Sequence, residues 1–451
     1  MLAATRDLDA LRTRLADWLA HRPGATWPVE VSALRKPGAG VSNETLLFDA
    51  RTGAGAPQHL VARLTPSGPA VFPEYDLARQ YRVMERLATS GVPVPPLVGY
   101  EADASVVGSA FYVMRRIEGE IPSEVPPYHA FGHCLALAPE RRAAMWWSGI
   151  ETLARIHRLD WRALGLGFLG EPGAETDALD RPLDYYARYL EWAREGEAQP
   201  ILDAALAWLR EHRYVPRRIG LCWGDSRLPN MIFDSDQRVA GVLDWEMAFL
   251  GDPEADLAWW IFLDWCHSTG YGIPRLEGLP SREETVARYA ELTGAPVEHL
   301  EWQEVFAALR YGVITVRVAH TMQAAGVSIA APDMATNNVC TQRLATLLGL
   351  PAPGVAREVT HVSDVTARVQ FLLTGPGGSE WYLVADRGRG SRHAGTVDRP
   401  DVTLTASAAD WQAIQTGELN RTEAFLGGKL RIEGDVSLLL QLEDMISKLA
   451  T

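Results

Sequence analysis

Cysteine, positive charge and long apolar runs are all scarce in this chain of 451 residues. The four cysteines, Cys134, Cys222, Cys266 and Cys340, form no close pair and no metal-ligand spacing. This pattern excludes a disulfide framework and a zinc-finger site, and it predicts four reduced, buried thiols. Acidic residues (57) outnumber Lys and Arg (43), for a formal net charge of -14. General binding to nucleic acid is therefore not expected, because it needs a basic surface.

No stretch of the sequence is suited to crossing a bilayer. The most apolar segment, residues 257–265, is interrupted by Asp264 and is far shorter than a membrane span. Charged residues such as Arg6, Asp7 and Asp9 recur through residues 2–20, so no secretory signal is expected there. We therefore expect a cytoplasmic protein with no stable membrane insertion.

Secondary-structure signals change along the chain, whose length predicts two or three domains. Residues 1–118 favour a sheet, with helices at 8–19 and 75–88 and strands at 29–34, 44–49, 60–64 and 109–117. Residues 119–350 favour helices, at 143–157, 183–193 and 201–211, interrupted by short strands at 231–233 and 239–243. A small sheet-rich lobe followed by a larger helical lobe is a two-lobed α+β arrangement.

The composition changes again at residues 350–354, Leu-Pro-Ala-Pro-Gly, which are typical of a linker. Beyond it, polar and apolar residues alternate at 369–373, 381–385 and 402–406, as in strands of a half-exposed sheet. The apolar residues of 438–449 lie on one helical face. We therefore expect a third, small α/β domain over residues 355–451.

One segment brings together the residue types that phosphoryl transfer needs. Asp225 and Asn230 lie five positions apart, and Asp244 follows fourteen positions after Asn230. The two short strands between them would form a hairpin that returns Asp244 to the side of Asn230. One carboxylate could accept the proton of an attacking hydroxyl, while an amide oxygen and the second carboxylate hold Mg²⁺ on nucleotide phosphates. A helix cap at Asp225 and a turn at Asp244 would leave this spacing unexplained.

Residues 223–259 resemble the signature of the aminoglycoside-phosphotransferase family, part of the protein-kinase-like superfamily. The family pattern Gly-Asp-x-x-x-x-Asn, then Asp-Trp-Glu, then Gly-Asp-Pro-x-x-Asp-Leu-Ala occurs here in order. The resemblance implies a two-lobed protein-kinase-like fold with ATP and Mg²⁺ as cofactors. It also implies that Asp225 is the catalytic base and that Asn230 and Asp244 bind Mg²⁺.

Three further positions of the resemblance are expected to be structural. Asp252 and Asp256, in the Gly-Asp-Pro segment, would brace the catalytic loop. His157, at the end of a predicted helix, matches a family position and is expected to pack and to cap that helix rather than to take part in catalysis.

The first lobe carries weaker signs of a nucleotide site. Residues 37–45 resemble the family's glycine-rich loop, in which Gly40, Ser42 and Asn43 would approach phosphate closely. Arg63 stands where kinases have a lysine that holds the α- and β-phosphates. Met114 and Arg115 would form the hinge that receives adenine. Each feature also has a plain structural interpretation: a hairpin turn, a surface arginine and a buried strand.

Two residues depart from the family pattern. Trp223 replaces the histidine that usually precedes Gly-Asp, at a position that is mainly architectural. Gln80 stands where relatives often have a glutamate paired with the basic residue of the strand. Either an Arg63–Gln80 hydrogen bond replaces that ion pair, or the pair is absent.

Residues from about 360 to 449 resemble the sterol-carrier-protein-2 family. The matching segments are 381–384, 401–405, 411–417 and 424–435, of which the last, with Gly428-Lys429 and Gly434-Asp435, is the most specific. The resemblance implies a five-stranded sheet with helices around an apolar tunnel for a fatty acyl or sterol-like ligand. A well-packed domain used for dimerisation or docking is the alternative.

Together these features predict an ATP- and Mg²⁺-dependent phosphotransferase that acts on the hydroxyl of a small molecule. The first two lobes also resemble the kinase-like domains fused to acyl-CoA dehydrogenases, which favours a hydroxyacyl-CoA or lipid-like acceptor. Two alternatives stay open: an aminoglycoside kinase, and a pseudokinase scaffold whose working part is the lipid-binding domain.

Overall fold

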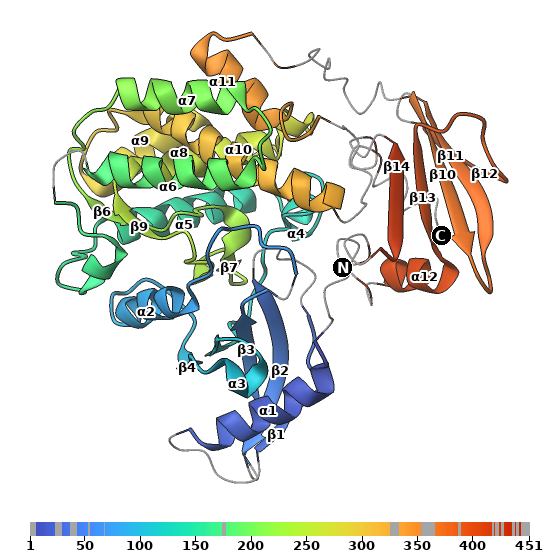
Figure 1. Ribbon diagram of the computed structural model, residues 1–451, viewed down its shortest axis with the longest axis horizontal. Coiled ribbons are helices and arrows are strands. Elements are labelled where there is room, and N and C mark those ends of the chain that lie inside the picture. The colour runs from blue at the N-terminus through green and yellow to red at the C-terminus, as the bar shows by residue number, and fades with distance from the viewer. Residues whose placement is uncertain are drawn as a thin grey trace.

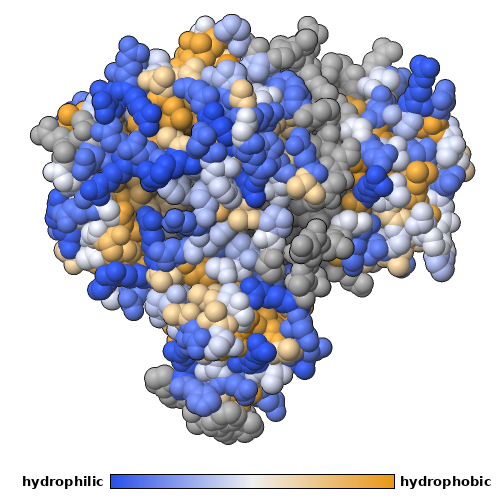
Figure 2. All heavy atoms as spheres, viewed as in Figure 1, coloured by the Kyte–Doolittle hydropathy of each residue, from blue (hydrophilic) through white to orange (hydrophobic). Residues whose placement is uncertain are grey.

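A computed structural model of the chain gives the arrangement of its elements (Figure 1). It describes residues 6–22, 29–36, 43–52, 55–66, 68–173, 177–324, 333–351, 353, 366–386, 389–416, 419, 424, 428–434, 438 and 442. Over the described part of the chain, no helix has both the length and the apolar character needed to cross a membrane. The four cysteines are free and buried, as predicted. Hydrophilic residues cover most of the visible face, and apolar residues form separate patches (Figure 2).

The first lobe is a five-stranded sheet with the strand order β1-β2-β3-β5-β4. Its elements are α1 (Leu8–Ala20), β1 (Val29–Val31), β2 (Glu44–Thr52), β3 (Gln58–Leu64), α2 (Leu77–Leu87), β4 (Leu97–Glu101), the short α3 (Ala104–Val107) and β5 (Phe111–Arg115). Both predicted helices and all four predicted strands are confirmed, as α1, α2, β1, β2, β3 and β5. The strand β4 was missed, because Pro93, Pro95 and Pro96 favoured an extended connector.

The period-two alternation of β3 decides where its arginine points. Leu60, Ala62 and Leu64 pack in the core beneath α1, whereas Val61 packs on the opposite face in the core shared with α2 and the helical lobe. Arg63, two residues beyond Val61, therefore lies on the same face as Val61 and is directed toward the second lobe.

The second lobe is built from helices packed around one apolar core. Its helices are α4 (His133–Ala136), α5 (Pro139–His157), α6 (Asp177–Ala193), α7 (Pro200–Glu211), α8 (Glu254–Cys266), α9 (Arg282–Thr293), α10 (Leu300–Ala324) and α11 (Val339–Leu348). The long helix α10 packs against α6, α7, α8 and α11 and so lies at the centre of the lobe (Figure 1).

Two small antiparallel pairs frame the loops that carry the predicted chemistry. β7 (Met231–Phe233) pairs with β8 (Val239–Val242), and β6 (Gly220–Cys222) pairs with β9 (Phe249–Gly251). The first pair is the predicted hairpin, and the N–H of Leu243 donates to the carbonyl of Asn230 across it at 2.9 Å. The chain thereby returns Asp244 to the side of Asn230, as predicted.

The C-terminal part forms a separate five-stranded sheet of order β12-β11-β10-β13-β14. Its elements are β10 (Thr366–Thr374), β11 (Ser379–Asp386), β12 (Arg389–Ala394), β13 (Val402–Ser407), α12 (Ala408–Thr416) and β14 (Leu430–Gly434). Phe371 and Trp381 stack in its core with ring centroids 3.7 Å apart. The five-stranded sheet is confirmed. The predicted final helix falls mostly outside the described residues, so the apolar tunnel stays a prediction.

Candidate active site

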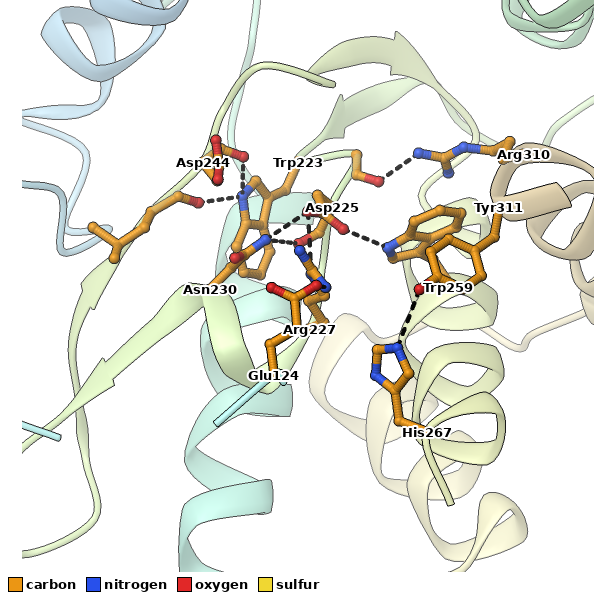
Figure 3. Close-up of polar contacts among 12 residues, drawn as sticks. Glu124, Trp223, Asp225, Arg227, Asn230, Asp244, Trp259, His267, Arg310 and Tyr311 are labelled. Carbon is orange, nitrogen blue, oxygen red and sulfur yellow. Dashed lines mark hydrogen bonds and ion pairs between the residues drawn. The ribbon is translucent and has the colours of Figure 1, made fainter. Parts of the chain in front are cut away.

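Asp225 is buried at the start of the loop that follows β6, and donors surround its carboxylate (Figure 3). The indole N–H of Trp259, on α8, donates to Oδ1 at 2.9 Å. The side-chain amide of Asn230 donates to Oδ2 at 2.7 Å, and the Nε of Arg227 donates to the same oxygen at 3.1 Å. Three donors fix the orientation of the carboxylate.

Arg227 ties this loop to the segment between the two lobes. Besides Asp225, its guanidinium pairs with the carboxylate of Glu124. Burial by itself would lower the pKa of Arg227, but the charges of Asp225 and Glu124 outweigh that effect and raise it. The sequence analysis assigned no role to Arg227 or to Glu124. Arg227 lies inside the recognised motif, but nothing in the sequence signals Glu124.

The loop is braced from behind by Asp256, as predicted. Its carboxylate accepts the backbone N–H groups of Trp223 at 2.6 Å and of Gly224 at 2.9 Å. His157 donates from Nε2 to the same carboxylate at 3.0 Å, and its Nδ1 contacts the hydroxyl of Tyr289 at 2.6 Å, so it packs and links α5 to α8.

Gly224 is required by the close approach of a second loop. It has a φ of 91°, and a Cβ at this position would lie 2.1 Å from the backbone oxygen of Met247. Only glycine fits there. Asp252 has a different role from Asp256: it accepts the hydroxyl of Tyr214 at 2.6 Å and the N–H of Glu254 at the start of α8.

Asp244 lies just after the hairpin in a left-handed conformation, with a φ of 59°. Such strain in a residue other than glycine is common at functional sites. The indole N–H of Trp223 donates to the carbonyls of Leu243 at 2.8 Å and of Asp244 at 3.1 Å. Trp223 therefore supports the turn that carries Asp244. This is the architectural role expected of the residue at position 223.

Three side chains of the first lobe reach this loop, and one of them is Arg79, which donates to the carbonyl of Ala248 at 2.6 Å. Arg63 donates to Oδ1 of Asp244 at 2.7 Å and to the hydroxyl of Thr45 at 3.1 Å. Asn43 donates to the carboxylate of Glu246 at 2.6 Å. Although burial would lower the pKa of Arg63, Asp244 and its neighbours raise it, so its guanidinium stays charged.

The other first-lobe residues that we expected to bind the nucleotide lie as follows. Gly40 and Ser42 are outside the described residues. Met114 and Arg115 end β5, where Met114 is buried and the backbone N–H of Arg115 already donates to the carbonyl of Pro96. Their contact with adenine stays a prediction.

An Arg63–Gln80 hydrogen bond, one of the two alternatives left open by the sequence, is not among the contacts of these two residues. Gln80 is buried on α2 and accepts the hydroxyl of Tyr112 at 3.3 Å. Arg63 reaches past it to Asp244 because β3 directs its side chain toward the second lobe. These contacts support the second alternative, in which Arg63 and Gln80 do not pair.

Below the loop, His267 is held in its neutral form. Burial lowers its pKa to about 3, and the charges of Arg227 and His129 act in the same direction. Its Nε2 contacts the hydroxyl of Tyr311 at 3.3 Å. A small crevice of about 10 Å³ beside it is lined by Arg227, Pro229 and Asp264, among others.

Comparison with known families divides the chain into two matched segments. Residues 33–296 match the model of the Phosphotransferase enzyme family, and residues 357–447 match the SCP-2 sterol transfer family. The fold agrees with both: the first match spans the two lobes, and the second covers the C-terminal sheet.

Two individual proteins are similar to about half of this chain. The chain is 34% identical to mouse acyl-CoA dehydrogenase family member 10 over 207 residues, which is 45% of this chain and 18% of that protein. It is 33% identical to chicken acyl-CoA dehydrogenase family member 11 over 245 residues, which is 51% of this chain and 28% of that protein. The chain thus spans less than a third of the length of either relative.

A solved structure is also similar to much of this chain. A Ralstonia eutropha JMP134 protein assigned to the aminoglycoside phosphotransferases superposes with a TM-score of 0.57 at 27% identity, covering 76% of this chain and 97% of that one.

Proposed function

We propose, from the premise that this chain belongs to the phosphotransferase enzyme family, that it transfers the γ-phosphate of ATP to a hydroxyl group of a small molecule. The observation that carries the proposal is the meeting of Asp225, Asn230 and Asp244 around one hairpin, with Arg63 of the other lobe donating to Asp244. Phosphoryl transfer depends mainly on positioning and charge, and this group supplies both.

Asp225 is the proposed base, and its two oxygens are not equivalent. Oδ2 already accepts two hydrogen bonds, from Asn230 and Arg227, whereas Oδ1 accepts one, from Trp259. A carboxylate oxygen has two lone-pair directions, so Oδ1 keeps one for an acceptor hydroxyl. In the proposed reaction the hydroxyl oxygen attacks the γ-phosphorus, its proton passes to Oδ1, and ADP leaves.

The residues present suit a magnesium ion. The amide nitrogen of Asn230 is turned to Asp225, which leaves its carbonyl oxygen for a ligand, and Asp244 uses only Oδ1 on Arg63. No group of three or more His, Cys, Asp or Glu side chains within the described ranges is arranged for a metal. Two oxygen ligands are nevertheless typical of Mg²⁺ shared with nucleotide phosphates, where it offsets phosphate charge.

Arg63 is the proposed phosphate ligand of the first lobe. Its Nε is buried and has no hydrogen-bond partner, so the guanidinium has donor capacity left beyond Asp244 and Thr45. A planar, permanently charged group is suited to phosphate oxygens. Asn43, Met114 and Arg115, with Gly40 and Ser42, complete the proposed nucleotide site.

An apolar hydroxyl compound, such as a hydroxyacyl-CoA, is the acceptor class that we favour. Four of the eight large exposed apolar side chains of the described chain lie within 121–135, around Glu124: Ile121, Val125, Phe131 and Leu135. Two acidic groups near the loop are already neutralised, Glu124 by Arg227 and Asp264 by Arg275. A polycationic aminoglycoside would need free acidic groups, so these contacts do not favour it. The names of the mouse and chicken relatives also point to acyl-CoA chemistry.

The C-terminal domain is the proposed carrier of a fatty acyl or sterol-like ligand, from its match to the SCP-2 sterol transfer family. We also propose the division into lobes 1–118 and 119–350 and a lipid-binding domain 355–451. In this arrangement one chain would hold both a lipid and the enzyme that modifies it.

Transfer of labelled phosphate tests the proposal. The protein would be incubated with [γ-³²P]ATP and Mg²⁺ and with either a series of hydroxyacyl-CoAs or kanamycin, with Asp225→Asn as the control. We expect label in a hydroxyacyl-CoA with the native protein alone. Label in kanamycin alone would identify an aminoglycoside kinase, and ATP binding without any transfer would support the pseudokinase alternative.

A further inference from the structure

Arg310 is a fully buried arginine directly behind the catalytic loop. It lies on α10 with 0% of its surface exposed, and its Nη2 donates to the backbone carbonyl of Gly224. Neither Nε nor Nη1 has a hydrogen-bond partner of normal geometry. The hydroxyl of Tyr186 is nevertheless near: burial raises the pKa of Tyr186, and Arg310 acts against that rise.

A guanidinium in this position is costly unless something compensates its charge. No ion pair joins Arg310 to a carboxylate within the described part of the chain. Arg142, which is also buried, donates to three backbone carbonyls, whereas Arg310 donates to one. Aromatic faces surround it instead. Its Cζ lies 4.2 Å from the ring centroid of Trp259, and three further rings lie at 5.4 to 5.8 Å. Cation–π attraction is strongest with Trp, so Trp259 is its main partner.

Two of the groups that Arg310 contacts, Gly224 and Trp259, act directly on Asp225. Gly224 is the residue before Asp225, and the indole N–H of Trp259 donates to Oδ1 of Asp225 (Figure 3). Oδ1 is also the oxygen that keeps a lone pair for the acceptor hydroxyl. One buried cation therefore holds both the peptide that carries the carboxylate and the ring that sets its angle.

We propose that Arg310 is a positioning residue for phosphoryl transfer, acting on Asp225 through Trp259 and Gly224. The inference rests on the proposed function, because it assigns Asp225 as the base. Without the guanidinium, the indole loses the cation on its face and the Gly224 carbonyl loses its donor. The carboxylate can then turn away from the direction of attack, while the nucleotide site is untouched.

The structure offers a matched control on the same helix. Arg317 is also largely buried, its Cζ lies 4.4 Å from the ring centroid of Trp192, and it donates to the carbonyl of Ala70. It differs in having Glu195 as a carboxylate partner and in lying away from the catalytic loop. Arg310→Met and Arg317→Met thus remove the same kind of contact in two places.

The first measurement needs no turnover. In ¹H–¹⁵N spectra of the full chain, the indole signal of Trp259 would be assigned by its loss in Trp259→Phe. We expect this signal to shift and to lose protection from solvent exchange in Arg310→Met, to be partly restored in Arg310→Lys and to be unchanged in Arg317→Met. An unchanged signal in Arg310→Met would overturn the proposal, whether or not the chain is a kinase.

The second measurement is MgATP turnover without added acceptor, with water as the attacking group. We expect kcat to fall about 10- to 100-fold in Arg310→Met with KM for ATP within about threefold, because small displacements of a base cost rate rather than affinity. Arg317→Met should lower the melting temperature but leave kcat in place. Arg310→Met combined with Trp259→Phe should be no slower than the slower single variant. Equal kcat in the two methionine variants would contradict the proposal, and native protein without turnover would instead contradict the proposed function.

Discussion

Asp225 and Asp244 come from one sequence signature, but the structure holds them in different ways. Asp225 is buried, and all three of its donors, on Trp259, Arg227 and Asn230, belong to its own lobe. The Asp244 side chain is 18% exposed, and its cationic partner, Arg63, comes from the other lobe. The second lobe by itself therefore fixes the orientation of the proposed base. The proposed metal ligand, Asp244, is instead paired with Arg63, and Mg²⁺ could take the place of that arginine when nucleotide phosphates bind.

Replacing the base gives the largest expected effect. Asp225→Asn keeps the shape and most hydrogen bonds but cannot accept the hydroxyl proton, so turnover should fall by about 10²- to 10⁴-fold. The affinity for MgATP, measured by calorimetry, should stay within about threefold of the native value, because Asp225 is not one of the proposed nucleotide or metal ligands. Turnover that survived the change would show that another group is the base.

Replacing the metal ligand should affect binding instead. In Asp244→Asn we expect the affinity gained from Mg²⁺ to fall by about 10- to 100-fold, since one of two oxygen ligands loses its charge. Titration of ATP with and without Mg²⁺ measures that gain directly. Asp252→Asn is the control, because it removes a buried carboxylate that contacts Tyr214 outside the site. The comparison between the two carboxylates would fail if Asp225→Asn lost the magnesium effect and Asp244→Asn kept it.

The sequence predicted the part of this site that is local along the chain. Asp225, Asn230 and Asp244 are separated by one loop and one short hairpin, so their spacing alone brings them together. The partners that orient the base could not be predicted in this way. Trp259, Arg310 and Glu124 lie 34, 85 and 101 positions from Asp225, and only the packing of α8 and α10 and the path of the connecting segment bring them near.

The partner of Arg63 was missed for a related reason. The family pairing left two alternatives, a hydrogen bond to Gln80 or no pair, and neither pointed to Asp244. The alternation of β3, which directs Arg63 toward the other lobe, was not used. The fold itself was largely predictable, because α1, β2, β3, α5 and the strands of the C-terminal sheet have clear periodicity. Both the glycine-rich loop and the last helix lie wholly or largely outside the described residues, and their roles stay predictions.

His267 makes the region around the base sensitive to acid. Its pKa of about 3 in the folded protein lies below the value of about 6.5 expected in the unfolded chain. As pH falls from 7 to 5, the unfolded state gains a proton that the folded state does not, so folding loses about 2 kcal/mol. Urea unfolding of His267→Gln should show a correspondingly smaller loss between these pH values. His212→Gln, at an exposed position, should behave like the native protein, and equal pH slopes in all three would contradict this account.

The smallest expected effect concerns the contact between Asn43 of the first lobe and Glu246 of the second. Asn43→Asp places a carboxylate against Glu246, where an amide now donates at 2.6 Å. Repulsion should open the cleft and raise KM for ATP by about tenfold, the cost of one charge-assisted hydrogen bond, with kcat little changed. Asn43→Ala should show a smaller rise, and steady-state kinetics at varied ATP separates the two parameters. A loss confined to kcat would mean that this contact serves the base and not the nucleotide.

Calorimetric titration of ATP into the native protein, with and without Mg²⁺, tests the central claim most directly. The account predicts binding that is strengthened by Mg²⁺, because Asn230 and Asp244 provide oxygen ligands and Arg63 is released to the phosphates. No binding under either condition would contradict the assignment of these residues to a nucleotide site, and with it the proposed phosphotransferase activity.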